Sequence, residues 1–281
     1  MTDPEAERQQ AMAALGAVGA GPDDGFDLAG AALLLASLTR PQVGLARYRA
    51  HLDEIAADLR AHAVDPPGSV EDAAAALVDS ISNRFGYAGD ILTYDDLQNA
   101  NLIRVIDRRK GLPVALGILY IHAARAQGWS ASGLNFPGHF LVRLEVGGGR
   151  AILDPFHDGR RCDPATLRAL LKDTQGQAAE LESGHYERVS DRAILLRLQN
   201  NVKLRLIQMR RAEEAVGIVE AMLAFAPTQV GLWREFGLLH AHLGNTKAAM
   251  DALERYLAQD PAARTRQEVL LLLQKLRRQL N

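Results

Sequence analysis

The sequence predicts a mainly helical α+β protein, and three features of the chain support this class. Residues 112–126 form an almost uncharged apolar stretch that is long enough for a buried helix. Short runs with strand character follow it, over residues 130–153. The last third of the chain is helical and repeats with a period of 34 residues. A buried helix beside a small antiparallel sheet is an α+β arrangement, and the repeats extend it with more helices.

The composition is that of a globular chain of 281 residues, 48% of them hydrophobic and 23% charged. The single cysteine, Cys162, excludes an intrachain disulfide and any zinc site built from several thiolates. The longest apolar run that could form one helix, residues 111–124, is shorter than the roughly 20 residues of a membrane-spanning helix. The first residues lack the basic start of a signal peptide. We therefore expect a soluble, cytoplasmic protein with no membrane partner.

The charge is distributed unevenly although the formal net charge is only -2. Residues 1–96 carry 6 basic and 16 acidic side chains, whereas residues 197–281 carry 13 basic and 8 acidic ones. That basic excess is small for a DNA-binding protein, which needs a concentrated stripe of phosphate contacts. The glycines of residues 147–149 lack the Lys-Ser/Thr that follows a phosphate-binding loop. We expect no nucleic-acid partner and no cofactor.

The N-terminal third divides into two expected parts. Residues 1–25 are poor in large apolar side chains, and we expect a flexible arm. Residues 26–95 are expected to be a helical lead-in, with apolar positions at helical spacing in each of three segments: 27–39, 41–59 and 70–81. A Pro- and Gly-containing break over residues 65–69 separates the second helix from the third.

The central part, residues 96–190, contains the predicted buried helix and the predicted sheet. Pro113 suits the first turn of that helix, since the N–H that proline lacks has no partner there, and Gly128 suits its end. Three runs have strand character: residues 130–134, 140–146 and 151–153. Glycines 147–149 predict a hairpin turn between the last two strands.

The final part, residues 191–281, is predicted to be a tetratricopeptide-repeat extension. Pro227 and Pro261 are 34 residues apart, which is the period of that repeat. Small Gly237 and Ala249 allow two antiparallel helices to approach closely, and residues 269–280 suit a capping helix. Two units are fewer than the three or so that a free solenoid needs, so we expect this block to lean on the central domain.

Two polar residues near the predicted strand ends suggest chemistry. His139 stands at the start of one strand and Asp154 at the end of the next. If these strands pair, the carboxylate can fix the tautomer and orientation of the imidazole. Such a pair normally serves a nucleophile at the N-terminus of a helix, where the helix dipole lowers the pKa of a thiol.

These motifs resemble the transglutaminase-like core, a branch of the cysteine-protease superfamily. In that family Gly-x-Cys opens the helix and Arg-x-x-Gly closes it; this chain has Gly111-Leu112-Pro113 and Arg125-Ala126-Gln127-Gly128. The position of the family's nucleophile therefore falls on Pro113, which has none. A bacterial SirB-type group, in which tetratricopeptide repeats follow the core, is similar over more of the chain. Its motifs correspond to Arg109–Pro113, Phe136–Phe140, Asp154–Phe156 and, less closely, Asp96–Leu102.

The resemblance implies an inactivated enzyme scaffold that acts as a binding or regulatory module. His139 and Asp154 would be a remnant dyad. The repeats and the remnant cleft would bind a protein or peptide. Around that cleft we expect four binding residues: Asn99, Arg109, Gly138 and Phe136. Arg109 belongs to a basic group, Arg104, Arg108, Arg109 and Lys110, that could attract an anion to the start of the helix.

Two enzyme hypotheses compete with the binding module. Cys162 could be a relocated thiolate with His139 as base and Asp154 as orienting group, which predicts a low pKa and rapid alkylation. Alternatively, His139 and His157 could bind a metal ion for hydrolysis, although no short ligand spacing supports such a site. The lone cysteine is otherwise a small packing residue.

Overall fold

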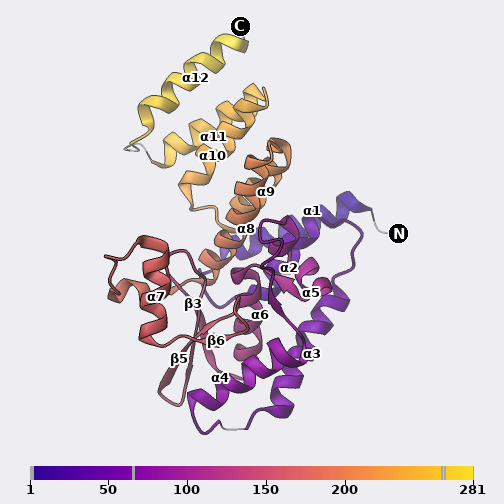
Figure 1. The fold of residues 1–281 in the computed structure, drawn as a ribbon. Helices are drawn as coiled ribbons and strands as arrows, with labels where there is room; N and C mark the ends of the chain where they lie inside the picture. Colours follow the sequence, from indigo (N-terminus) through magenta and orange to yellow (C-terminus); the bar gives the residue numbers. More distant parts are fainter. Residues whose placement is uncertain (1–2, 65–66, 261, 263, 281) are drawn as a thin grey trace. The chain divides into compact units, whose positions relative to one another are not determined.

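The computed structural model of the protein describes residues 3–64, 67–260, 262 and 264–280. The chain forms two compact units (Figure 1). The first unit contains the residues up to Ala11 and Pro22–Leu198, and the second contains Met12–Gly21 and the residues from Gln199 onward. No helix among the described residues is long and apolar enough to span a membrane.

The segment that we expected to be a flexible arm is instead largely a helix, α1 (Pro4–Ala20). Its sequence is rich in alanine, which has the highest helix propensity. Leu15 is fully buried and Ala11 is 5% exposed, so the helix is also fixed by packing. The sequence did not predict this packed helix because its apolar face contains few large residues.

Three helices follow in the first unit, as the sequence predicts. α2 (Leu28–Leu38) is capped by Asp27, whose Oδ1 accepts a hydrogen bond from the Gly30 N–H at 2.9 Å. α3 (Ala46–His62) begins later than the predicted start at Pro41. α4 (Val70–Val78) continues into a π-helical stretch, η1 (Asp79–Arg84). Part of the predicted break, residues 65–66, lies outside the described residues.

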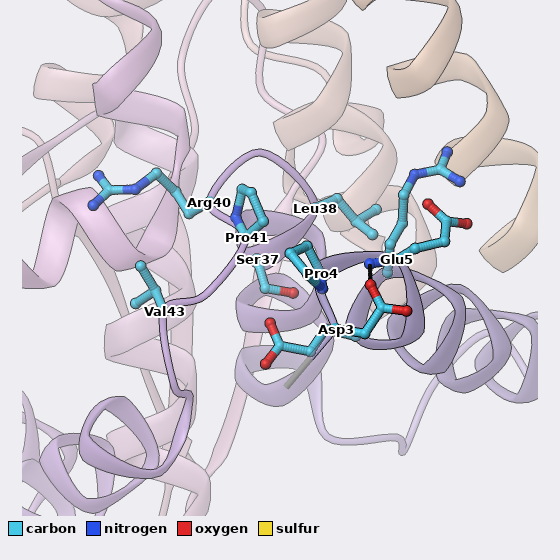
Figure 2. Close-up of a pocket in the computed structure, with 10 residues that line it drawn as sticks. Asp3, Pro4, Glu5, Ser37, Leu38, Arg40, Pro41 and Val43 are labelled. Atoms are coloured by element: carbon cyan, nitrogen blue, oxygen red, sulfur yellow. Dashed lines mark hydrogen bonds between the residues drawn. The ribbon is translucent and has the colours of Figure 1, made fainter. Parts of the chain in front are cut away.

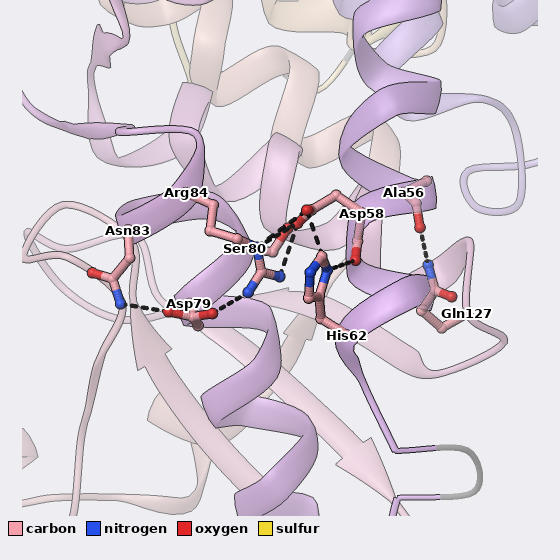
Figure 3. Close-up of polar contacts among 8 residues, drawn as sticks. All are labelled: Ala56, Asp58, His62, Asp79, Ser80, Asn83, Arg84 and Gln127. Carbon is pink, nitrogen blue, oxygen red and sulfur yellow. Dashed lines mark hydrogen bonds and ion pairs between the residues drawn. The ribbon is translucent and has the colours of Figure 1, made fainter.

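A polar cluster joins α3 to the helices beside it (Figure 3). The Asp58 carboxylate accepts hydrogen bonds from the Ser80 hydroxyl at 2.7 Å and from Arg84 Nε at 2.9 Å. Gln127, beyond the end of the central helix, donates to the Ala56 carbonyl at 2.9 Å. These contacts fix the helical lead-in against the core, so residues 26–95 and 96–190 lie within one compact unit.

The predicted buried helix is α6 (Pro113–Arg125), and ten of its thirteen residues are buried. It follows the 3-10 turn η2 (Leu97–Ala100), α5 (Leu102–Arg108) and β2 (Lys110–Gly111), which pairs in parallel with β1 (Ala88–Gly89). α2 and α3 pack against α6 (Figure 1). The apolar, uncharged character of this stretch is therefore explained by burial on nearly all sides.

The antiparallel sheet has the strand order β6-β5-β4-β3-β7. Its strands are β3 (Ser130–Leu134), β4 (Val142–Val146), β5 (Gly149–Asp154), β6 (Arg160–Arg161) and β7 (Arg188–Val189). Gly147 and Gly148, both with positive φ, form the tight turn between β4 and β5. α7 (Pro164–Gln175) contributes leucines to an apolar cluster with Ile152 of β5.

The second unit contains the predicted repeat helices. α8 (Asp191–Gln208) crosses the boundary between the units, and α9 (Ala212–Phe225), α10 (Val230–His242), α11 (Thr246–Gln259) and α12 (Arg266–Leu280) follow. A Cβ on Gly237 would lie 2.6 Å from Leu253 Cγ, so the small residue permits the close α10–α11 contact. The capping helix is α12. Pro261, which marks the repeat period, lies outside the described residues.

Candidate functional site

The start of α6 is the place where the resemblance puts a nucleophile. Pro113 is the first residue of the helix, and it is only partly buried. The preceding residue is held in place by a hydrogen bond from the Leu112 N–H to the Asn99 carbonyl at 2.9 Å. The start of the helix is thus fixed by a backbone hydrogen bond, and the partly exposed side chain there is a pyrrolidine ring.

The loop that carries His139 lies beside this helix start because of Phe140. The Phe140 ring is buried between two glycines: a Cβ on Gly117 of α6 would lie 2.3 Å from it, and one on Gly133 of β3 would lie 2.8 Å from it. Pro113 and Gly117 are one turn apart on the same helix face. Phe140 therefore fixes the end of the His139 loop against α6 one turn after Pro113.

Asp154 and His139 are brought near each other, but Asp154 has another partner. β4 and β5 pair antiparallel with Val142 opposite Leu153, so the two strand ends meet as predicted. Asp154, 2% exposed, accepts from His157 Nδ1 at 2.7 Å and from the Phe156 N–H at 3.1 Å. Among the described residues no hydrogen bond joins the His139 imidazole to Asp154, in contrast to the dyad that we predicted.

The half-buried His139 ring is electrostatically coupled to the same cluster. Burial lowers the pKa of His139 below its ordinary value, because the charged imidazolium loses hydration. The Asp154 carboxylate opposes this effect, while the charges of His157 and Arg197 add to it. Arg197 also donates to the His139 carbonyl at 2.6 Å. Burial therefore favours the neutral form of the His139 ring.

Cys162 is a packing residue in this structure. It is 7% exposed and lies in an apolar cluster with Phe136, Ile152 and leucines of α7. Burial is the main cause that raises the pKa of its thiol to about 11, and the charge of Asp154 adds to the effect. Its Sγ lies 3.7 Å from the Arg160 carbonyl, a weak hydrogen bond. The residue also lines a cavity of about 530 Å³ with Arg150 and Arg161, but burial outweighs the nearby positive charge, so the thiol is not activated.

Asn99 does not line an open cleft. It is completely buried, where its amide donates to the Thr93 carbonyl at 2.6 Å and its Oδ1 accepts from Arg108 Nη1 at 2.9 Å. Arg108 in turn pairs with Asp90 at 2.7 Å. The Asn99 side chain thus fixes the loop before it. It also hydrogen-bonds Arg108, one of the basic residues that we expected to attract an anion.

Arg109 is engaged in the protein interior as well. Its guanidinium lies over the Tyr87 ring, 4.8 Å from the centroid, and hydrogen-bonds the Tyr87 hydroxyl and the His51 ring. The pKa of His51 is lowered mainly by desolvation and further by the charge of Arg109. Arg109 itself adopts a left-handed backbone conformation that ends α5. Its role is to link α3 to the start of the core, which differs from the predicted anion site.

The two remaining predicted binding residues shape the His139 loop. Phe136 is 2% exposed and packs within the Cys162 cluster, with its ring 6.2 Å from that of His139. Gly138 has a positive φ of 72°, and a Cβ there would lie 2.5 Å from Thr174 of α7. Both residues position the loop, and neither offers a free polar group to a ligand.

Other possible sites in the described part of the chain are less specific. No group of three His, Cys, Asp or Glu side chains there has the arrangement of a metal site. A cavity of about 390 Å³ lies between the start of α1 and the α2–α3 connection. Figure 2 shows Asp3 and Glu5 of this cavity beside Ser37 and Pro41. Its lining does not include any residue of the His139–Asp154 region.

We expected His157 only as a possible metal ligand, whereas in the structure it is the partner of Asp154. Its ring is 44% exposed while its Nδ1 faces Asp154, so the other ring nitrogen is the one available for proton transfer or hydrogen bonding. The three-residue spacing from Asp154, across a turn that the Gly159 N–H closes onto the Asp154 carbonyl, was the available signal. The cluster offers an exposed imidazole nitrogen for hydrogen bonding, and the single thiol of the chain, Cys162, is not activated.

Comparison with known proteins agrees with this architecture. The model of the transglutaminase-like superfamily matches residues 46–200, which is more than half of the chain, and a tetratricopeptide-repeat model matches residues 202–274. The first of these includes the start of α6, the His139 loop and Asp154. The second begins next to the boundary between the two compact units.

Several bacterial proteins are similar to more than half of this chain. A UPF0162 protein of Xylella fastidiosa is 33% identical over 182 residues, which are 64% of this chain and 65% of that protein. A UPF0162 protein of Vibrio cholerae is 31% identical over 64% of this chain and 67% of its own length. Protein SirB1 of Salmonella typhimurium is 27% identical over 57% of this chain and 60% of its own length. The chain thus spans slightly less than two thirds of the Xylella protein. From its core, its repeats and these relatives, the chain belongs to the transglutaminase-like superfamily, within the SirB-type group.

Proposed function

We propose that this protein is a non-catalytic member of its family and binds a protein or peptide. The observation that carries the proposal is the start of α6, where Pro113 occupies the position of the family's nucleophile. The single thiol of the chain cannot replace it readily, because Cys162 is buried among apolar side chains with a raised pKa. Asp154 is committed to His157, so the predicted base lacks its orienting partner.

Alkylation of Cys162 tests whether the single thiol of the chain is activated, as the thiol-enzyme hypothesis requires. A rise of the thiol pKa from 9.0 to about 11 lowers the thiolate fraction at pH 8 about 100-fold. We therefore expect iodoacetamide to modify folded Cys162 at least about 100-fold more slowly than the urea-unfolded chain. Mass spectrometry of the intact protein measures both rates.

The matched control places a thiol where the family has one. In a Cys162→Ala background, Pro113→Cys creates a partly exposed cysteine at a helix N-terminus, where the dipole favours the thiolate. This variant should be alkylated much faster than folded Cys162. Rapid modification of Cys162 in the native protein would instead support the thiol-enzyme hypothesis.

A second line of support for binding is a row of side chains on the repeat helices. Lys203 of α8 pairs with Glu235 of α10, and Arg234 of α10 lies 3.6 Å from Glu268 of α12. These ion pairs connect side chains of α8, α10 and α12, so the three helices contribute to one surface of the second unit. Such a surface, formed by every other helix, is the one that tetratricopeptide arrays present to partners.

One turn beyond the ion pairs, each of these helices exposes a large apolar side chain. We call Ile207, Leu238 and Leu271 the apolar row; they are 45%, 38% and 60% exposed. Each is three or four residues from a member of an ion pair, so it projects from the same helix face. Basic residues follow: Arg210 in the turn after α8 and Lys275 on α12 are both exposed. Because each of the two ion pairs is neutral as a pair, Arg210 and Lys275 leave this group of side chains with a net charge of +2, which fits an acidic segment with apolar side chains.

Binding of designed peptides tests this part of the proposal. We expect a fluorescein-labelled peptide that alternates Leu with Asp to bind at least about tenfold more tightly than one that alternates Leu with Lys, by fluorescence anisotropy. Leu238→Asp should weaken the Leu-Asp peptide about tenfold or more, since it removes an apolar contact and adds a like charge.

The control for that substitution is Ala258→Asp, which adds the same charge at an exposed position on α11, outside the apolar row. It should leave peptide affinity within about twofold. Equal binding of the acidic and basic peptides, or equal losses in the two variants, would contradict an acidic-apolar ligand at the apolar row.

A further inference from the structure

An unusual feature of the first unit is an exposed apolar loop over residues 91–94. Ile91 is 72% exposed and Leu92 is 88% exposed, next to each other in sequence, and Tyr94 is 41% exposed. Single exposed aliphatic residues are ordinary, but adjacent ones at the tip of one loop form a patch of the kind that marks interaction sites. Tyr94 stacks edge-on against Phe156, so the patch borders the Asp154 cluster.

The loop is rigidly held although its tip is exposed. Asp90, 3% exposed, accepts from the Thr93 hydroxyl at 2.6 Å, the Thr93 N–H at 3.0 Å and Arg108 at 2.7 Å. The Asn99 amide donates a hydrogen bond to the Thr93 carbonyl. These interactions determine the backbone on both sides of Ile91 and Leu92. A preorganised apolar tip loses little conformational entropy on binding, which is the property of an interface anchor.

The chemistry of this loop matches the apolar row of the second unit. Ile91 and Leu92 are followed by Asp95 and Asp96, so an apolar pair precedes an acidic pair. The apolar row is followed by Arg210 and Lys275. The larger regions show the same complementarity, since residues 1–96 carry a net charge of -10 and residues 197–281 a net charge of +5.

We propose that the chain self-associates head to tail, with the 91–94 loop of one copy docking on the apolar row of a second copy. The inference rests on the proposed binding function and names one occupant for the same surface. Because the two contacting surfaces are different, the contact is heterologous, and repeated contacts form rings or open chains. The apolar anchors supply the affinity, and the opposite charges orient the approach.

The test is the oligomeric state of the purified full chain, measured by sedimentation velocity up to about 0.5 mM, which reaches weak contacts. We expect the average mass to rise with concentration. Leu92→Asp and Leu238→Asp should each weaken association at least about tenfold. Val64→Asp changes another residue of the first unit that is 70% exposed, and Ala258→Asp changes the second unit; both controls should associate like the original chain.

Mixing the two defective variants distinguishes a heterologous contact from a symmetric one. Leu92→Asp retains an intact apolar row, and Leu238→Asp retains an intact loop. An equimolar mixture should therefore restore one contact per pair and stop at a 1:1 dimer, whereas either variant alone stays monomeric. A symmetric loop-to-loop or row-to-row contact cannot produce this recovery.

Two results would overturn the inference: a monomer at every concentration, or a mixture that associates no better than its components. The Leu-Asp peptide then separates the two proposals. If the chain is monomeric but the peptide still binds the apolar row, self-association is wrong and the proposed function stands with an outside partner. If the peptide fails to bind while head-to-tail association is observed, the general peptide ligand is wrong and the second copy remains. Circular dichroism of each variant verifies that the surface substitutions leave the fold intact.

Discussion

Replacing Asp191 with alanine is expected to lower the free energy of unfolding of the first unit by about 3 kcal/mol. Asp191 is 1% exposed, and its carboxylate receives two parallel hydrogen bonds from Arg125, at 2.8 and 2.9 Å. Arg125 Nε also donates to the Ala131 carbonyl at 3.0 Å, and the Gly25 N–H donates to Asp191. Removing the carboxylate takes the two-fold hydrogen-bond partner from Arg125, whose side chain is 35% exposed, and leaves an unfilled space at the buried Asp191 position.

Urea unfolding measures this loss, and the two tryptophans make it specific. Trp129 belongs to the first unit and Trp233 to the second, so a Trp233→Phe background reports the first unit alone by fluorescence. The control is Glu71→Ala, which breaks an ion pair with Arg161 in which the two side chains are 51% and 55% exposed, and it should cost at most about 1 kcal/mol. A comparable small loss for Asp191→Ala would show that the buried pair contributes little.

Replacing Phe140 with alanine is expected to cost about 3–5 kcal/mol, as for other fully buried phenylalanines. The ring fills the space between Gly117 and Gly133, and the Arg197 guanidinium lies 5.5 Å from its centre. Its loss opens a cavity beneath the His139 loop. Burial lowers the pKa of His139, so loosening the loop should also return that pKa toward its ordinary value, which an NMR titration measures.

Gly117→Ala examines the same contact from the opposite side. Its new methyl group would lie 2.3 Å from the Phe140 ring, so we expect a loss of about 1–3 kcal/mol despite the higher helix propensity of alanine. In the Phe140→Ala background the same substitution should be neutral or stabilising by up to about 1 kcal/mol, because the ring is gone. Additive effects in this double-mutant cycle would contradict the contact.

Several elements of the fold were predictable because their signals are local. The apolar run of α6, the proline at its start and the glycine turn between β4 and β5 each depend on residues within a few positions. The repeat helices were predictable for the same reason. α1 was missed because its helix is built from alanines, and its burial depends on residues far away in sequence.

The candidate site was predicted less completely because its contacts are not local. Pairing of β4 with β5 brings His139 near Asp154, as expected, yet the turn after Asp154 folds His157 onto the carboxylate first. Arg109 and Asn99 were predicted at the cleft from their place in a motif. Both are instead used inside the protein, where aromatic rings and buried carbonyls satisfy them.

By itself, the sequence determined the fold class, the family, the absence of a cysteine at the start of α6 and the presence of repeat helices. These depend on residue identity and short-range periodicity, which folding does not change. Only the tertiary structure decided that Cys162 is buried, that Asp154 pairs with His157, and that the 91–94 loop and the apolar row are exposed. Burial and exposure depend on which distant segments pack together, because hydration is lost only where another part of the chain covers a side chain.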